Sequence, residues 1–133
     1  MKRLTRDWVR KAEADYRGVR LLQNSPEPVH DLVCFHCQQL VEKYLKALLE
    51  ESGLGVPRTH DLDRLLSLLQ ATFPSLTKLK RGLQFLSRYA VDTRYPGDDA
   101  TRRQAASALR WSERVRQECR TLLGITTQRK KSR

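Results

Sequence analysis

A chain of 133 residues, 39% hydrophobic and 31% charged, has the composition of one soluble globular domain, long enough to bury a core without disulfides or metal. No segment approaches the roughly 20 apolar residues of a membrane span, and the charged N-terminus lacks the apolar stretch of a signal peptide. Three cysteines in such a chain favour free thiols in a reducing cytoplasm, and a net charge of +11 makes polyanions candidate partners.

The first predicted helix spans about residues 5–23. Its apolar residues recur at steps of three and four, which places them on one face of a helix. These residues are Trp8, Val9, Ala12, Tyr16, Val19 and either Leu21 or Leu22. Two prolines within residues 24–28 end the helix, because proline lacks an N–H and disfavours helix in the residue before it.

The second predicted helix, residues 30–52, is apolar over a wide arc and is therefore expected to be the central element of a bundle. Asp31 is an expected N-cap or first-turn acid. A narrower polar stripe remains on this helix: His36, Gln39, Lys43 and Lys46, with Glu42 beside it. Glu42 and Lys46 lie four residues apart in the order that favours an ion pair along a helix.

Three further helices complete the prediction. A third helix begins after Thr59 or Asp61 as its N-cap, a fourth covers 76–91, and a fifth covers 100–123. The third helix has five leucines as expected core residues: Leu62, Leu65, Leu66, Leu68 and Leu69. We therefore predict an all-α fold over residues 1–124, an up-and-down antiparallel bundle of four to five helices, followed by a disordered basic tail over 125–133.

The spacing Cys34-x-x-Cys37 is one that also serves zinc and redox sites. Here it lies inside a predicted helix, and a zinc site would require His30, His60 or Cys119 to converge on it. Free cysteines on an apolar helix face are usually small buried residues, and that interpretation is favoured. No metal site and no cofactor are expected.

Two loop positions are candidates for ligand binding. His60 precedes the third helix, where outward-pointing N–H groups favour an anion, although a simple role in capping that helix is an alternative. Arg94 and Tyr95 follow the fourth helix and pair a phosphate-binding group with a ring that can stack on a base. Packing of Tyr95, and an ion pair from Arg94 to Asp92 or Asp98, is the competing interpretation.

Together these residues resemble the HEPN domain, the higher eukaryotes and prokaryotes nucleotide-binding family. The resemblance rests on Gln-Gln-x-x-Glu-Lys-x-x-Lys at 38–46, His-Asp-Leu at 60–62 and Arg-Tyr-Pro at 94–96, and it covers about residues 5–123. It implies a helical bundle that commonly forms a homodimer and is often encoded beside a minimal nucleotidyltransferase, as in toxin–antitoxin-like modules.

Many members of that family are metal-independent ribonucleases whose motif is an arginine followed by a histidine after four to six intervening residues. In this sequence the positions that would hold such an arginine are 23–25, 29–31 and 53–55, and none of them is arginine. The glycine-serine and paired-aspartate signature of the transferase is also missing. The resemblance therefore favours a non-catalytic member, with no catalytic residue assigned.

We expect this member to bind a nucleotide or RNA, or a nucleotidyltransferase chain. The expected ligand-binding residues are Gln39, Glu42, Lys43, Lys46, His60, Asp61, Arg94 and Tyr95. In this interpretation Lys43, Lys46 and Arg94 bind phosphate. Tyr95 stacks on a base or donates its hydroxyl, and His60 donates to an oxyanion.

Three alternatives remain open. The first is a ribonuclease that uses His60 with Arg94 or Arg58 in a non-standard arrangement. The second is a structural or dimerisation module, in which Glu42, Lys43 and Arg94 form a buried network without a ligand. The third is a nucleic-acid binder that relies on arginine-rich helix faces and the basic tail, whose binding would weaken steeply with salt.

Overall fold

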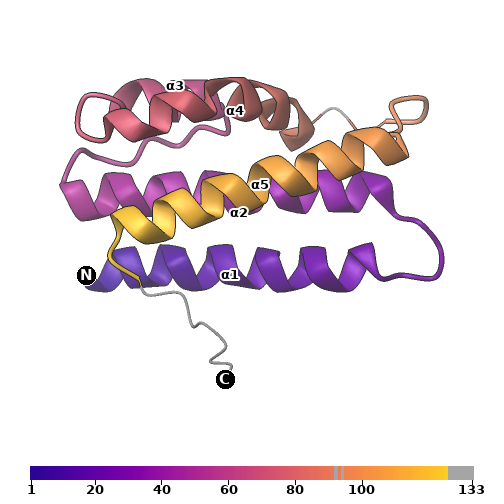
Figure 1. The fold of residues 1–133 in the computed structure, drawn as a ribbon, viewed down its shortest axis with the longest axis horizontal. Coiled ribbons are helices and arrows are strands. Elements are labelled where there is room, and N and C mark those ends of the chain that lie inside the picture. The colour runs from indigo at the N-terminus through magenta and orange to yellow at the C-terminus, as the bar shows by residue number, and fades with distance from the viewer. Residues whose placement is uncertain (92, 94, 126–133) are drawn as a thin grey trace.

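Five α-helices make up the fold in the computed structural model, which describes residues 1–91, 93 and 95–125 (Figure 1). The α-helices are α1 (Arg3–Gln23), α2 (His30–Ser52), α3 (Leu62–Leu69), α4 (Lys80–Ser87) and α5 (Arg102–Leu122), and two 3-10 helices cover Pro74–Leu79 and Arg88–Ala90. The predicted all-α class is confirmed. In the part of the chain that is described, no helix is long and apolar enough to cross a membrane.

Helix α2 is the centre of the bundle, as its apolar residues predict. It packs against α1, α3, α4 and α5. Helix α1 runs beside it on one side, the short helices α3 and α4 lie on the other, and α5 crosses it obliquely (Figure 1). A helix with neighbours on several sides must be apolar around most of its circumference. Its fully buried residues include Cys34, Cys37, Tyr44, Leu45 and Leu48.

Local sequence signals set several helix ends. Gly53 ends α2 in the left-handed conformation, with φ of 68°, which glycine adopts without steric cost. The Asp61 carboxylate caps α3 by accepting from the N–H groups of Asp63 and Arg64 at 3.0 and 3.3 Å. Asp31 lies in the first turn of α2 and accepts from the Ala100 N–H at 2.6 Å, which ties the start of α2 to the segment before α5.

Two details differ from the prediction. The segment expected to form one helix over 76–91 is a 3-10 helix, then α4, then a 3-10 turn, because Pro74 opens the segment with the tighter geometry and the last turn tightens again. Leu68 is 40% exposed and does not belong to the core. The other four leucines of α3, at spacings of three and four, form the single face that this short helix buries.

The cysteine thiols are buried, as expected for packing residues. Cys34, Cys37 and Cys119 have no exposed surface. Burial raises the pKa of the Cys34 thiol to about 11 and that of Cys37 to about 12. Both groups are therefore protonated at neutral pH, whereas a thiol must lose its proton to act as a nucleophile or metal ligand.

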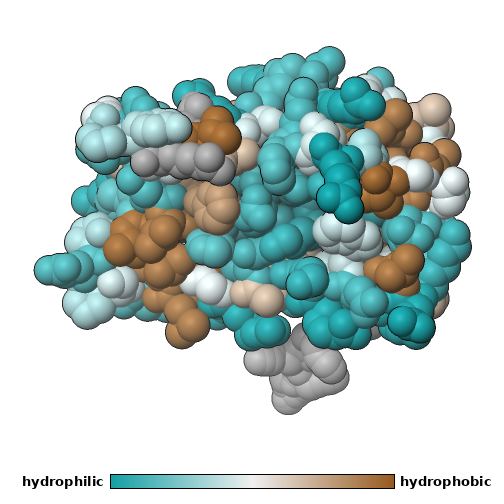
Figure 2. All heavy atoms as spheres, turned by 180° about the vertical axis from the view of Figure 1, so that it is seen from behind, coloured by the Kyte–Doolittle hydropathy of each residue, from teal (hydrophilic) through white to brown (hydrophobic). Residues whose placement is uncertain are grey.

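The surface seen from behind is mostly hydrophilic, and hydrophobic side chains gather there in a few separate patches (Figure 2). Leu21 and Leu32, near the turn between α1 and α2, are 76% and 47% exposed. A contiguous exposed apolar patch on a folded domain is typical of a surface that contacts another molecule.

The contact between α4 and α5 depends on a glycine. A Cβ atom at Gly82 would overlap the Trp111 ring, whereas one at Gly18 in α1 would have no neighbour within 4 Å. We predict that Gly82→Ala lowers the free energy of unfolding by about 1–3 kcal/mol, because overpacking forces the helices apart. The matched control Gly18→Ala should raise it by about 0.5–1 kcal/mol. Urea unfolding followed by circular dichroism measures both; an unchanged or more stable Gly82→Ala protein contradicts the packing described.

Candidate functional site

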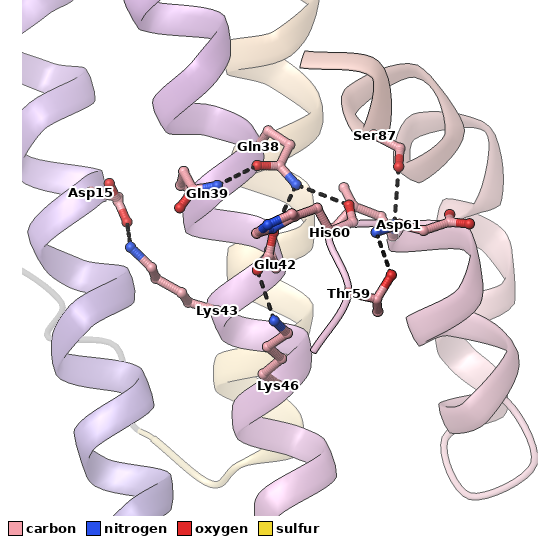
Figure 3. A network of polar contacts seen from close by, with 11 residues as sticks. Asp15, Gln38, Gln39, Glu42, Lys43, Lys46, Thr59, His60, Asp61 and Ser87 are labelled. Carbon is pink, nitrogen blue, oxygen red and sulfur yellow. Dashed lines mark hydrogen bonds and ion pairs between the residues drawn. The ribbon is translucent and has the colours of Figure 1, made fainter. Parts of the chain in front are cut away.

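The side of α2 that faces the loop before α3 carries a buried carboxylate, Glu42, which is only 4% exposed. Its Oε2 accepts from Lys46 Nζ at 2.8 Å, and its Oε1 lies 3.0 Å from Gln38 Nε2 and 2.9 Å from His60 Nδ1 (Figure 3). A buried charge is tolerated only where it is paired and hydrogen-bonded. Both oxygens of Glu42 meet that condition.

The pKa of Glu42 reflects this balance. Burial by itself would raise the pKa, but the hydrogen bonds from Lys46, His60 and Gln38 outweigh it, so the pKa lies below its ordinary value. Glu42 is therefore an anion at neutral pH. Because an ionised carboxylate is only an acceptor, the proton in the contact with His60 belongs to Nδ1 of the imidazole.

Gln38 connects the helix to the loop and was not among the predicted site residues. It is fully buried, and its amide nitrogen donates both to Glu42 and to the backbone oxygen of His60, at 3.2 Å. Its amide oxygen accepts from Gln39 Nε2 at 2.8 Å. The spacing of four residues between Gln38 and Glu42 was the available signal, because it places both side chains on one helix face.

One ring nitrogen of His60 contacts Glu42, while most of the side chain is exposed to solvent. Its side chain is 69% exposed although Nδ1 contacts the buried Glu42. The adjacent loop is fixed, because Asp61 N–H donates to Thr59 Oγ1 at 3.1 Å and Leu62 N–H donates to Ser87 Oγ at 3.0 Å (Figure 3). Asp61, not His60, caps α3, so the alternative that His60 is merely the cap is wrong.

The remaining part of the predicted polar stripe faces α1. Lys43 Nζ lies 2.6 Å from Asp15 Oδ2, and His36 Nδ1 lies 2.8 Å from Asp15 Oδ1. Lys43 therefore points away from Glu42 and toward α1 (Figure 3). The sequence predicted one stripe, and the structure divides it into two clusters on either side of α2.

A third polar cluster joins α1, α2 and α5. Arg116 donates to both oxygens of Glu13, at 2.8 and 3.0 Å. Tyr44 Oη also donates to Glu13, and Arg120 donates to Tyr44 Oη at 3.2 Å. Burial would raise the pKa of Glu13, but the hydrogen bonds from Arg116 and Tyr44 lower it below its ordinary value. These residues are distant in sequence, so no local pattern predicts this cluster.

A cavity of about 650 Å³ opens beside His60. Its lining comes from the start of α1, the second half of α2 and the loop before α3, and includes Trp8, Lys46, Arg58 and His60. Lys46 Nζ lies 5.6 Å from the centroid of the Trp8 ring, within the range of a cation–π contact. Lys46 thus connects the Glu42 cluster to the wall of the cavity.

The expected ligand-binding residues do not form one group. Gln39, Glu42, Lys46, His60 and Asp61 lie in and around the Glu42 cluster. Tyr95 is 66% exposed and lines a different hollow, together with Arg88 and Gln104, so it shares no cavity with His60. Arg94 lies outside the described residues, as does the tail from 126 onward.

The family model described as HEPN domain matches residues 5–122, which is most of the chain. No curated protein and no solved structure gives a significant match.

Removing the Glu42 charge tests the buried cluster. Glu42→Gln would leave the Lys46 ammonium, with 8% of its side chain exposed, without its counter-charge, so we expect a loss of about 3–5 kcal/mol at pH 7. The exposed control Glu27→Gln should change stability by less than about 0.5 kcal/mol.

The stability difference between the wild-type protein and Glu42→Gln should change with pH in a direction that the pKa of Glu42 sets. Since the folded pKa of Glu42 lies below its ordinary value of 4.5, its contribution is complete above pH 4.5 and is lost as pH falls through the folded pKa. The stability gap between the wild-type protein and Glu42→Gln should therefore narrow below pH 4.5. Urea unfolding from pH 7 to pH 3 measures this gap, and a constant gap would contradict the account because it would show that folding does not lower the pKa of Glu42.

Proposed function

The chain belongs to the HEPN family, a family associated with nucleotides and RNA. From this we propose that it is a non-catalytic, cytoplasmic member that binds a nucleotide or RNA and acts as a homodimer, as the partner of a minimal nucleotidyltransferase in a toxin–antitoxin-like module.

The observation that carries the proposal is the exposed His60 beside a cavity whose lining includes basic side chains. The Nδ1 atom of His60 is held by Glu42, while Nε2 remains available to a ligand. Arg58 and Lys11 line the same cavity. Guanidinium and ammonium groups at the edge of a cavity are suited to phosphate. The net charge of +11 favours the approach of a polyanion.

The roles expected from the sequence change for Glu42, Lys43 and Lys46, and also for His60, whose bare Nε2 in the neutral ring accepts a hydrogen bond. Lys46 and Glu42 are buried and paired with each other, so they maintain the shape of the site and do not bind phosphate themselves. Lys43 is engaged with Asp15. Arg58, Lys11 and His60 take over the contacts with the ligand in this proposal.

Two parts of the proposal concern other chains. The exposed Leu21 and Leu32 supply apolar surface that a second copy of the chain would cover. The sequence lacks the glycine-serine and paired-aspartate signature of a transferase, so nucleotidyl transfer within such a module is assigned to the partner chain.

A metal-independent ribonuclease is the second candidate, and one arrangement favours it. A carboxylate that accepts from Nδ1 holds an imidazole in the tautomer whose Nε2 can take up a proton, as a general base requires. Arg58 lines the same cavity as His60 and would stabilise charge on the phosphate. The usual arginine–histidine spacing is absent, which places this candidate second.

One set of samples separates the two candidates. Purified protein is mixed with labelled single-stranded RNA in EDTA; fluorescence anisotropy measures binding, and a denaturing gel measures cleavage. We expect RNA binding that weakens as the salt concentration rises, and RNA that stays intact. For Arg58→Ala, the plot of log binding constant against log salt concentration should be shallower by about 0.7, the value for one lost phosphate contact on a single strand. Light scattering of the same protein should give twice the chain mass of 15.5 kDa.

The control is Arg81→Ala, an exposed arginine on α4, a helix that does not pack against α1, where the cavity begins. This variant should bind RNA like the wild-type protein. Cleavage that disappears in His60→Ala would replace the non-catalytic proposal by the ribonuclease. Absence of RNA binding at low salt would contradict both, and a monomeric mass would contradict the homodimer.

A further inference from the structure

The cavity beside His60 has a large apolar part as well as charged side chains of both signs. Leu4 and Trp8 of α1 line it on one side, and Val56 and Pro57 of the loop line it on another. Its volume of about 650 Å³ lies within the range of small-molecule sites, which are mostly apolar with a few polar groups that fix orientation.

Trp8 contributes an indole ring to the lining of this cavity. The periodicity of α1 predicted Trp8 as a residue of the buried face, yet it is only partly buried and lines the cavity. Its ring also contacts the Lys46 ammonium, which Glu42 holds in place. An indole fixed in this way is a preformed platform for another flat ring, because stacking then requires little ordering of the side chain.

Some charged groups of the cavity lining form ion pairs, and others do not. Lys46 is paired with Glu42, and Asp7 is paired with Arg10 at 2.7 Å. Over the described part of the chain, no ion pair involves Lys11, Arg58 or the Glu50 carboxylate.

The free groups match the parts of one class of ligand. Two cations are suited to a phosphate. One carboxylate is suited to accept from a sugar hydroxyl or from an amino group on a base. Together with the indole ring they describe a ligand that has an aromatic ring, hydrogen-bond donors and a phosphate.

We propose that this cavity binds a single unpaired nucleotide, with its base stacked on Trp8, its phosphate between Lys11 and Arg58, and its sugar or amino donors toward Glu50. The proposal rests on the proposed nucleotide- or RNA-binding function and specifies the site and the unit that is recognised. A free mononucleotide and the unpaired terminal nucleotide of an RNA share this chemistry.

Tryptophan fluorescence tests the proposal directly, since Trp8 and Trp111 are the two tryptophans of the chain. In a Trp111→Phe background all tryptophan emission comes from Trp8. AMP should quench this emission in a saturable manner, adenosine should do so more weakly, and inorganic phosphate should compete with AMP without quenching. A single-stranded RNA with a 5′-phosphate should quench as well; its strength relative to AMP shows whether the natural source is an RNA end or a free nucleotide.

Substitutions separate the two halves of the site. Trp8→Leu should weaken AMP binding, measured by calorimetry, about tenfold or more, as expected for loss of one stacked base. Arg58→Ala should weaken AMP binding but leave adenosine binding unchanged, whereas Arg81→Ala should affect neither. Arg58 is exposed and forms no ion pair with the residues that the structure describes, so this variant tests the site even if Trp8→Leu folds poorly.

The failures of the two proposals are distinguishable. If RNA binds in the anisotropy assay but neither AMP nor RNA quenches Trp8, and Trp8→Leu binds RNA normally, the nucleotide site is wrong while the RNA-binding function stands. If neither RNA nor AMP binds, both are wrong. If AMP and adenosine bind equally and Arg58→Ala changes neither, the phosphate position is wrong.

Discussion

The ion pair between Glu42 and Lys46 is the interaction on which the candidate site depends. Two opposite charges taken out of water must satisfy each other and all their remaining hydrogen-bonding capacity, because the cost of desolvation otherwise exceeds their attraction. Lys46 satisfies one oxygen of Glu42, and Gln38 and His60 satisfy the other. The loop before α3 is therefore tied to α2 through His60, and Lys46 is fixed where it contacts Trp8.

The same principle extends through the bundle. Asp15 ties α2 to α1 through Lys43, and Glu13 ties α1 to α5 through Arg116 and to α2 through Tyr44. Apolar attraction is non-directional, whereas a carboxylate removed from water requires hydrogen-bond donors at defined positions. The apolar core stabilises the packed helices, and Glu42, Asp15 and Glu13 fix how the loop before α3, helix α1 and helix α5 are placed relative to α2.

The sequence predicted the helices well because their signals are local. Apolar spacing located α1, α2 and α5 to within two residues at each end, and Asp61, one of the two predicted N-caps, caps α3. The site was predicted only in part. Sequence spacing shows which residues share a helix face, but not which neighbouring element that face contacts. It therefore groups Lys43 with Lys46, although Lys43 contacts Asp15 of α1 and Lys46 contacts Glu42. Glu13 and Arg116 are 103 residues apart, and no local pattern connects them.

The most direct test of this account is the protonation state of the His60 ring in the wild-type protein. Nitrogen-15 NMR at a pH where the imidazole is neutral distinguishes a protonated ring nitrogen from a bare one. If Glu42 is the buried anion that orients the site, the proton is on Nδ1 and Nε2 is bare. A proton on Nε2 with a bare Nδ1 would contradict the account, because His60 would then have nothing to donate to Glu42.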